Sequence, residues 1–440
     1  MKKIIKKIIP KSLFNLYHLA WAFFSALYFA FPSKGMVVIG VTGTKGKSSS
    51  VYMLSKVLDS AGLDVAVSSS LIFKIKKEEW VNPYHMTMVG RFRLQKFLKN
   101  AKDQGCKYVI IEVTSEGIMQ SRHRLIDFDI AIFTNLSEEH LEAHGGFDNY
   151  KKAKGELFAS LGKSKRKIID GEKIKKVIIA NTDDANSEYF LNFNADKKIG
   201  FALNKSCNKS YLDKCFIASS VNLESGGSSF SLNEQSFKMK LFGEFNIYNA
   251  LSVVSCADTL GLSLKDTKSA IESIEEIPGR VEFIKAGQKF KAIVDLAHTP
   301  SSFDAIFKAV NLIKNNNSRV ISVFGSAGGG RDKWKRSELG KIAAQNSDII
   351  ILTNEDPYDE DSSGIISDIK KGILNESFSG DLSVIQDREQ AIEKAVLIAK
   401  DNDVLLFLGK GTERTMVVGE KTISWNEEEL VKSKINEYKK

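Results

Sequence analysis

Residues Ile39–Ser48 read IGVTGTKGKS, a glycine-rich run between two patterned segments. The apolar run Met36–Gly40 leads into it, and the amphipathic stretch Val51–Ala61 follows it. Short apolar runs rich in β-branched residues are typical of buried parallel strands, whereas the apolar spacing after the loop is typical of a helix. The pattern therefore predicts a strand, a glycine-rich loop and a helix in direct succession.

The composition of this loop indicates a phosphate-binding site. Gly43 and Gly46 allow successive backbone amides to curl round phosphate oxygens at the N-terminus of the helix. Lys47 is then placed to reach the β- and γ-phosphates of a nucleotide, and the Ser48 hydroxyl to bind Mg²⁺. The strict P-loop pattern has glycine at the position of Val41, so we predict a variant P-loop that binds ATP.

The rest of the chain alternates apolar runs with amphipathic segments, which predicts an α/β fold with a parallel sheet and crossover helices. Further strands of the first unit are expected at residues 108–113, 130–134 and 177–180, with helices at 91–104 and 246–260. A Ser-, Asn- and Gly-rich stretch at 204–240 predicts a small antiparallel β patch. Beyond a hinge at Pro278-Gly279, a second, Rossmann-like unit is expected from the apolar runs 292–296, 320–324, 349–352 and 404–408.

The charge of the chain argues against a nucleic-acid partner. Lys plus Arg number 63 against 54 for Asp plus Glu, a net charge of +9 in 440 residues. Five of these positive charges lie at Lys2, Lys3, Lys6, Lys7 and Lys11, so the other 429 residues carry only +4. We therefore expect no nucleic acid among the partners.

The segment Leu13–Phe31 is apolar or aromatic at sixteen of nineteen positions. No small-x-small cleavage site precedes Pro32, which argues against a signal peptide. A membrane span would keep the preceding lysines in the cytoplasm and export the ATP loop. We expect instead a helix that docks on the protein or lies at the membrane interface, with peripheral membrane contact through residues 1–31. The protein would then be cytoplasmic, with any membrane contact at the inner face.

The cysteines and histidines suggest neither a disulfide framework nor a zinc site. Cys106, Cys207, Cys215 and Cys256 lie apart without CxxC spacing, so we expect them to be reduced. The six histidines form no HExxH motif.

Three side chains near predicted strand ends indicate a second part of the site. Glu112 closes one strand, and His140 and His144 follow another. The carboxyl ends of parallel strands face the same crevice as the phosphate loop. A carboxylate and an imidazole there predict Mg²⁺ between the phosphates and a substrate, and hence metal-assisted phosphoryl transfer.

A series of motifs then runs in fixed order from residue 43 to residue 413. They are GTKGKS at 43–48, EVTS at 112–115, TNLSEEHLEAHG at 134–145, YKKAK at 150–154, Gly243 with Asn246 and Asn249, GRVE at 279–282, DLAHTP at 295–300, GGGRDKWKR at 328–336 and GKGTE at 409–413. This series resembles the Mur ligases, the ATP-dependent amide-forming enzymes of peptidoglycan precursor synthesis, and within them the MurE (tripeptide synthetase) branch. The resemblance covers roughly residues 36–425.

The resemblance implies a reaction and a set of residues. Such ligases transfer the γ-phosphate of ATP to a substrate carboxylate, and an amine then displaces phosphate from the acyl phosphate to form an amide. The acceptor implied is a UDP-N-acetylmuramyl peptide, and the amine is a free amino acid. Matching positions imply that Gly43, Thr44, Lys45, Gly46, Lys47 and Ser48 bind the triphosphate, that Lys47, Glu112, His140 and Lys154 are catalytic, and that Ser48, Glu112, His140 and Lys154 hold metal.

Lys154 matches the lysine that this family carbamylates. An ammonium group repels Mg²⁺, whereas a carbamate offers hard anionic oxygens. Without the resemblance, Lys154 would be one more surface lysine beside Lys151 and Lys152.

The resemblance also implies contacts with adenosine and with both substrates. The adenosine residues would be Asn249, Arg280 and Asp295, with Asn249 at the adenine. Positions that match the acceptor site are Thr87, Thr114, Gln120 and Arg122, and those that match the pocket for the incoming amino acid are Arg331, Asp356, Gly409 and Glu413.

Three departures from the family pattern concern the substrate. Only about 35 residues precede the ATP loop, so we expect the uridine-binding N-terminal domain to be absent. Diaminopimelate-type enzymes carry Asp-Asn-Pro-Arg where this chain has Glu355-Asp356-Pro357-Tyr358, so lysine or another amine becomes plausible. Glu116, Glu139 and Met88 replace a usual histidine, aspartate and threonine.

We thus expect an N-terminal basic and apolar helix (residues 1–35), a central ATP-binding Mur ligase domain (36–277) and a C-terminal Mur ligase domain (278–440) in a monomer. One alternative is a ligase for another carboxylate, lipid-linked muramyl or poly-glutamyl. Another is a non-catalytic nucleotide-binding scaffold, which the presence of Lys47, Glu112 and His140 disfavours.

Overall fold

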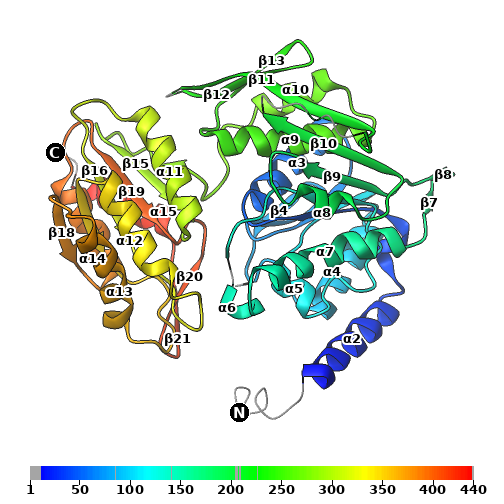
Figure 1. The fold of residues 1–440 in the computed structure, drawn as a ribbon, viewed down its shortest axis with the longest axis horizontal. Helices are drawn as coiled ribbons and strands as arrows, with labels where there is room; N and C mark the ends of the chain where they lie inside the picture. The colour runs from blue at the N-terminus through cyan, green and yellow to red at the C-terminus, as the bar shows by residue number, and fades with distance from the viewer. Residues whose placement is uncertain are drawn as a thin grey trace.

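The computed structural model describes residues 11–438 apart from residues 85, 140, 204–206, 208–209 and 225, and side chains from residue 16 onward. Figure 1 shows two lobes, one coloured blue to green and the other yellow to red. Each lobe is built on its own mostly parallel sheet with helices packed on it. The predicted α/β class is confirmed.

The first sheet has eleven strands, with the phosphate-loop strand β1 well inside it. Its order is β13 (Gln235–Met239), β12 (Gly227–Leu232), β11 (Lys214–Glu224), β10 (Lys197–Leu203), β9 (Val177–Asn181), β6 (Ile130–Phe133), β1 (Val37–Thr42), β5 (Tyr108–Glu112), β2 (Val65–Ser68), β3 (Ile72–Ile75) and β4 (Glu78–Val81). The strands from β11 to β2 pair in parallel, and both edges end in antiparallel strands.

The second sheet is smaller and has one antiparallel edge strand. Its order is β14 (Glu282–Phe283), β15 (Lys291–Asp295), β19 (Val404–Leu408), β16 (Val320–Phe324), β17 (Ile349–Leu352) and β18 (Asp381–Val384). Two short hairpins, β7 (Ile168–Ile169) with β8 (Glu172–Lys173) and β20 (Thr415–Val418) with β21 (Lys421–Ser424), lie outside both sheets.

The helices connect these strands. In the first lobe they are α2 (Lys11–Tyr28), the 3₁₀ helix η1 (Pro32–Gly35), α3 (Lys47–Ser60), α4 (Arg91–Asp103), α5 (Ser115–Met119), α6 (Leu141–His144), α7 (Phe147–Lys163), α8 (Ser187–Leu191), α9 (Glu244–Thr259) and α10 (Leu264–Glu272). In the second lobe they are α11 (Pro300–Ile313), α12 (Lys335–Asn346), α13 (Ser362–Asn375), α14 (Arg388–Ile398) and α15 (Glu427–Glu437).

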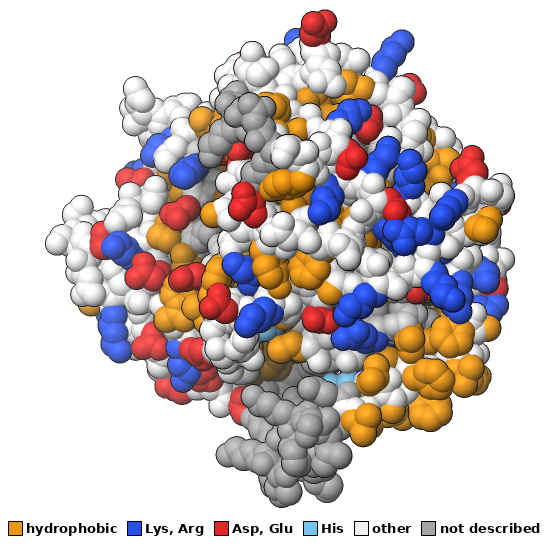
Figure 2. Space-filling model, turned by 45° about the vertical axis from the view of Figure 1, so that its right-hand side comes forward, with side chains coloured by type: hydrophobic (Ala, Val, Ile, Leu, Met, Phe, Trp, Pro, Cys, Tyr) orange, Lys and Arg blue, Asp and Glu red, His pale blue; other side chains and the backbone are white. Residues whose placement is uncertain are grey.

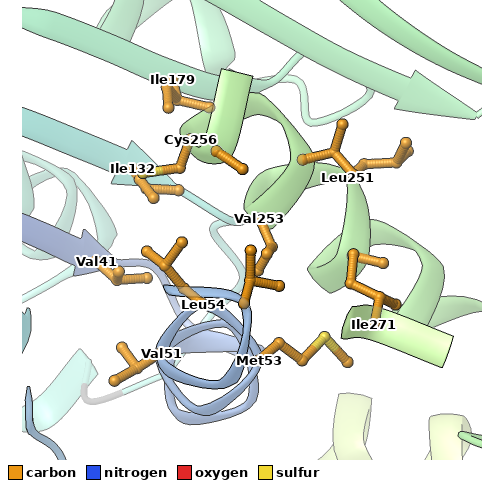
Figure 3. Packing of buried hydrophobic residues seen from close by; sticks show 14 of the residues in the cluster. Val41, Val51, Met53, Leu54, Ile132, Ile179, Leu251, Val253, Cys256 and Ile271 are labelled. Carbon is orange, nitrogen blue, oxygen red and sulfur yellow. The ribbon is translucent and has the colours of Figure 1, made fainter. Parts of the chain in front are cut away.

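The core of the first lobe fixes the position of the phosphate loop. Figure 3 shows Val41 of β1, Leu54 of α3 and Val253 of α9 pointing into one cluster, and all three side chains are fully buried. On the opposite face of the sheet, Val38 packs in a second cluster with residues of α4 and α7. Because β1 is covered on both faces, the loop that follows it leaves the sheet from a rigid base.

Two expectations about the first lobe need correction. The stretch 204–240 does contain antiparallel strands, but β11 also pairs in parallel with β10, so the patch continues the main sheet. The cysteines were expected to be reduced, and this was wrong for one pair, because Cys207 and Cys215 form a disulfide across the β10–β11 connection. Cys106 and Cys256 are free and buried.

The apolar N-terminal segment forms α2, which packs against α4 and is thus docked on the first lobe. Within the described part of the chain, no helix combines the length and apolarity needed to cross a bilayer.

Candidate active site

The phosphate loop is held by the loop that follows β6. The Thr44 amide donates to the Asn135 carbonyl at 2.8 Å, and the Lys45 amide donates to Asn135 Oδ1 at 2.9 Å. The Thr134 hydroxyl donates to the Lys45 carbonyl at 2.6 Å. Gly46 caps α3 in the left-handed region (φ 80°), which a side chain would strain. Lys47 Nζ donates to the carbonyls of Gly43 and Thr44 at 3.1 and 2.9 Å.

Ser48 and Glu112 meet as the sequence analysis predicted. The Ser48 hydroxyl donates to Glu112 Oε1 at 3.0 Å, and Glu112 is buried at the end of β5. Ser70, in the β2–β3 turn, donates its amide and its hydroxyl to Glu112 Oε2 at 2.9 and 3.0 Å. The carboxylate is therefore fixed in orientation beside a hydroxyl at the start of α3, a set of hard oxygen donors suited to Mg²⁺.

Lys154 reaches the same place from α7. Its Nζ donates to the Gly43 carbonyl at 2.7 Å, and the side chain is almost fully buried. Burial, followed by the charge of Lys47, holds the pKa of Lys154 well below its usual value. The amine is thus unusually easy to deprotonate.

Two histidines, His140 and His144, were predicted near the phosphate loop. His140 lies outside the described residues. His144 lies within hydrogen-bond distance of the Ser115 hydroxyl, Nε2 to Oγ at 3.1 Å, and packs edge-on against Tyr150. Burial, followed by Lys154, lowers the pKa of His144, so the ring is neutral and holds α6 against α5 and α7.

The second lobe and α9 contribute residues opposite the phosphate loop. Arg280 Nη2 donates to the Ser48 hydroxyl at 3.4 Å across the lobes. Asp295, at the end of β15, accepts from the amides of Val281 and Ala297 at 2.8 and 2.6 Å, and burial raises the pKa of Asp295. The Asn249 side chain lies against Gly46, where a Cβ would come within 2.3 Å of Asn249 Oδ1.

A third group of charged residues lies where β17 and β19 end. Lys410 is fully buried and donates to Asp356 Oδ2 at 2.8 Å and Glu413 Oε2 at 2.6 Å. Burial alone would lower the pKa of Lys410, but Glu413 and Asp356 raise it above its usual value. Glu355 Oε2 is buried and has no hydrogen-bond partner among the described residues, and a Cβ on Gly409 would come within 2.6 Å of it.

Most of these residues, but not His144 or Lys410, line one cavity of about 670 Å³ between the lobes. Its lining includes the predicted residues Thr44, Lys45, Gly46, Lys47, Ser48, Thr87, Glu112, Thr114, Lys154, Asn249, Arg280, Asp295, Arg331, Asp356, Gly409 and Glu413. Gly43 is not in the lining, but its carbonyl accepts from Lys47 Nζ and Lys154 Nζ. Gln120 and Arg122 are beside the cavity rather than in its lining, because Arg122 donates to the Met88 carbonyl and to Gln120 Oε1.

Several lining residues were not predicted. Ser70 carries no sequence signal, because only the β2–β3 turn brings it to Glu112. His298 lies 3.7 Å from Glu139 across the lobes, Nε2 to Oε1, and burial lowers the pKa of His298 to about 4. Lys410 is not in the lining but holds the lining residues Asp356 and Glu413; its signal was present in the GKGTE motif at 409–413, although only its neighbours were singled out.

The described residues supply two oxygen donors and a buried amine at the predicted metal position. In the part of the chain that the structure describes, no three His, Cys, Asp or Glu side chains gather into a metal-binding group. Ser48 and Glu112 supply oxygens, and Lys154 supplies a buried amine.

Comparisons with known proteins agree with this geometry. The model of the Mur ligase middle domain matches residues 41–257, and that of the Mur ligase glutamate ligase domain matches residues 279–411. The UDP-N-acetylmuramyl-tripeptide synthetase of Treponema denticola is 36% identical over 415 residues, covering 92% of this chain and 77% of that protein. The UDP-N-acetylmuramoyl-L-alanyl-D-glutamate–2,6-diaminopimelate ligase of Clostridium botulinum is 32% identical over 424 residues, covering 95% and 82%.

Solved structures share the fold. A UDP-N-acetylmuramoyl-L-alanyl-D-glutamate–2,6-diaminopimelate ligase superposes with a TM-score of 0.59 at 27% identity, covering 91% of this chain and 78% of that one. A folylpolyglutamate synthase of Mycobacterium tuberculosis has a TM-score of 0.68 at 13% identity, covering 89% and 92%, which shows the fold alone. With the matched domains and the relatives above, the chain belongs to the Mur ligase family of ATP-dependent, amide-forming ligases.

Proposed function

We propose that this chain uses ATP and Mg²⁺ to add a free amino acid to a UDP-N-acetylmuramyl peptide. The observation that carries the proposal is the single cavity that joins the phosphate loop, the acceptor positions Thr87 and Thr114, and the charged group at Asp356 and Glu413. Three reactants can therefore meet in one cavity between the lobes. The relatives named as MurE-type ligases at 30% identity and above support the same assignment.

The reaction follows from this arrangement. A carboxylate oxygen of the acceptor attacks the γ-phosphorus of ATP, and the bond to ADP breaks, which leaves an acyl phosphate. The amino-acid nitrogen then attacks the acyl carbon, loses a proton, and phosphate departs with the electrons of the carbon–oxygen bond. Lys45 and Lys47 neutralise charge on the phosphates, and catalysis is mainly positioning and electrostatic stabilisation.

Ser48 and Glu112 are the residues proposed to hold Mg²⁺, with His140 as a further ligand at a position outside the described residues. When bound there, Mg²⁺ would neutralise charge on the transferring phosphoryl group.

Lys154 is proposed to act as a carbamate. Its lowered pKa favours the neutral amine, which adds CO₂ with formation of an N–C bond and loss of one proton. The product places an anion beside Lys47 that can face Mg²⁺ and orient the phosphates. The burial of Lys154 supports this role, because an isolated buried ammonium is costly.

The pocket at the end of β17 and β19 is proposed to receive the amino acid, with Arg331, Asp356, Gly409 and Glu413 in contact with it. Glu355 also contributes to the lining, and its buried Oε2 has no hydrogen-bond partner among the described residues. For Gln120 and Arg122 we propose a supporting role beside the acceptor rather than direct contact. We also propose a cytoplasmic monomer with domains at residues 36–277 and 278–440 behind the N-terminal helix.

The acyl phosphate can be tested with an acceptor whose carboxylate is labelled with ¹⁸O. Each turnover should transfer one labelled oxygen to inorganic phosphate, and release should require acceptor, amino acid and ATP together. Unlabelled phosphate would contradict the acyl phosphate route.

A further inference from the structure

Helix α2 presents its large apolar side chains to solvent. Ala22, Ser25 and Ala26 face the protein and are buried. Leu16, Trp21, Phe23, Phe24, Leu27 and Tyr28 all point away and are exposed, Phe24 to 61% and Tyr28 to 75%. A surface helix of a globular protein normally buries its large apolar residues and exposes polar ones. The orientation of α2 is the reverse, so its outer face is built to contact something else.

This outer face is fixed to the first lobe. The Phe92 ring of α4 contacts both the Tyr28 and the Phe29 rings, with centroids 5.7 and 4.9 Å away. Near the other end of the helix, the Arg91 guanidinium is hydrogen-bonded to the His18 ring. The apolar face of α2 therefore has a defined position relative to α4.

The neighbouring helix α4 is strongly basic. It carries Arg91, Arg93, Lys96, Lys99 and Lys102 against a single acidic residue, Asp103. Arg93, Lys96 and Lys102 are exposed. Figure 2 shows hydrophobic side chains gathered at the lower right of the view, with Lys and Arg side chains directly above them. The sequence before α2 adds lysines at positions 2, 3, 6 and 7.

We propose that the outer face of α2 and the basic side chains of α4 together form a docking surface for an anionic lipid bilayer. Trp, Tyr and Phe side chains suit the headgroup layer because they are apolar with, in two cases, a polar tip. Lysine and arginine beside them match the negative charge of the lipid. A second copy of the chain would bring two basic α4 helices together, which disfavours a dimer through this face.

Docking would also orient the cleft. The Arg93 guanidinium lies over the Tyr84 ring at 4.7 Å, and Tyr84 lines the cavity together with Met86 and Thr87. The acceptor end of the cavity is therefore close to the proposed docking surface, and the second lobe is farther from it (Figure 1).

Vesicle flotation with the full chain tests this proposal. The protein should float with vesicles of equal parts phosphatidylcholine and phosphatidylglycerol, remain largely unbound with pure phosphatidylcholine, and dissociate as NaCl is raised. Replacing Phe24 and Leu27 by serine should reduce partitioning by about tenfold or more. Lys96→Glu with Lys102→Glu should remove the preference for anionic lipid.

Matched controls lie on the second lobe. Leu374 and Leu397 are equally exposed apolar residues, and their replacement by serine should leave flotation unchanged. Lys421→Glu with Lys432→Glu makes the same change in net charge far from α4 and should also leave it unchanged. Failure of the wild-type protein to float, or equal flotation of the Phe24/Leu27 variant, would overturn the proposal. So would a dimer, seen by light scattering, that the same variant converts to a monomer. None of these three results depends on ligase activity.

Discussion

Replacement of Gly46 by alanine should lower both the free energy of unfolding and the affinity of the phosphate loop for ATP. Gly46 has φ 80°, and a Cβ there would lie 2.3 Å from Asn249 Oδ1. Gly62, just beyond α3, has φ 72° with no atom within 4 Å of its Cβ position. Both substitutions require alanine in the left-handed region, which costs about 1–2 kcal/mol. Only Gly46→Ala also forces a buried neighbour to move.

The additional cost of Gly46→Ala follows from the hydrogen bonds that Asn249 makes. Its Oδ1 accepts from the Ser50 hydroxyl at 3.3 Å, and its Nδ2 donates to Asn246 Oδ1 at 3.1 Å. Disturbing both removes about 1–3 kcal/mol, so Gly46→Ala should lower the free energy of unfolding by about 2–5 kcal/mol in total. ATP affinity should also fall, because the loop and the proposed adenine contact shift together.

Urea unfolding and nucleotide titration measure the two effects. Gly62→Ala should lose only about 1–2 kcal/mol and keep its ATP affinity. In the double variant Gly46→Ala/Asn249→Ala the clash is absent, so a double-mutant cycle should give a coupling of about 1–2 kcal/mol. Equal losses of unfolding free energy for Gly46→Ala and Gly62→Ala, with unchanged ATP affinity in both, would show that the Asn249 clash has no effect.

Three further predictions test other parts of the molecule. Lys154→Ala should abolish phosphate release, and short carboxylic acids should restore part of it in a steady-state assay; full activity without added acid would exclude the carbamate. Burial lowers the pKa of Lys45 from 10.5 to about 8. Between these two pH values the unfolded state therefore binds more protons than the folded state. The free energy of unfolding should rise with pH over the same range. ATP affinity should fall as pH rises through about 8, and Lys45→Met should flatten both curves in urea and nucleotide titrations. Arg388 and Glu427 form a fully buried ion pair, with Arg388 also donating to backbone carbonyls at the ends of β17 and β19. Glu427→Gln should lower the free energy of unfolding by about 3–5 kcal/mol, because it leaves the Arg388 charge buried without its partner. Arg388→Met/Glu427→Leu should lower it by less in thermal unfolding, and equal losses for the two variants would contradict this prediction.

Much of the fold could be predicted because its strands are buried on both faces. The runs 320–324, 349–352 and 404–408 coincide with β16, β17 and β19, since a fully covered parallel strand is a continuous apolar run. The antiparallel extension through β3 and β4 was not predicted. All four residues of β4, Glu78–Val81, are exposed, so this strand lacks the apolar pattern that reveals a buried one.

The candidate site also contains some contacts that the sequence predicts and others that it does not. Ser48 and Glu112 were predicted as neighbours because a strand end and a phosphate loop must face one crevice. The contact of His298 with Glu139 joins the two lobes, and the place of Arg122 depends on how its loop folds back onto Met88. Neither follows from local sequence, because both are set by tertiary packing.

Phosphate release tests whether this chain is an ATP-dependent ligase for a UDP-muramyl acceptor. Purified protein with ATP and Mg²⁺ should be assayed against a matrix of acceptors and amino acids, with formation of the amide product followed by mass spectrometry. We expect phosphate release to require a UDP-N-acetylmuramyl peptide and an amino acid together, with one amide formed for each phosphate released. Release that no UDP-muramyl peptide stimulates, or release without amide formation, would contradict it.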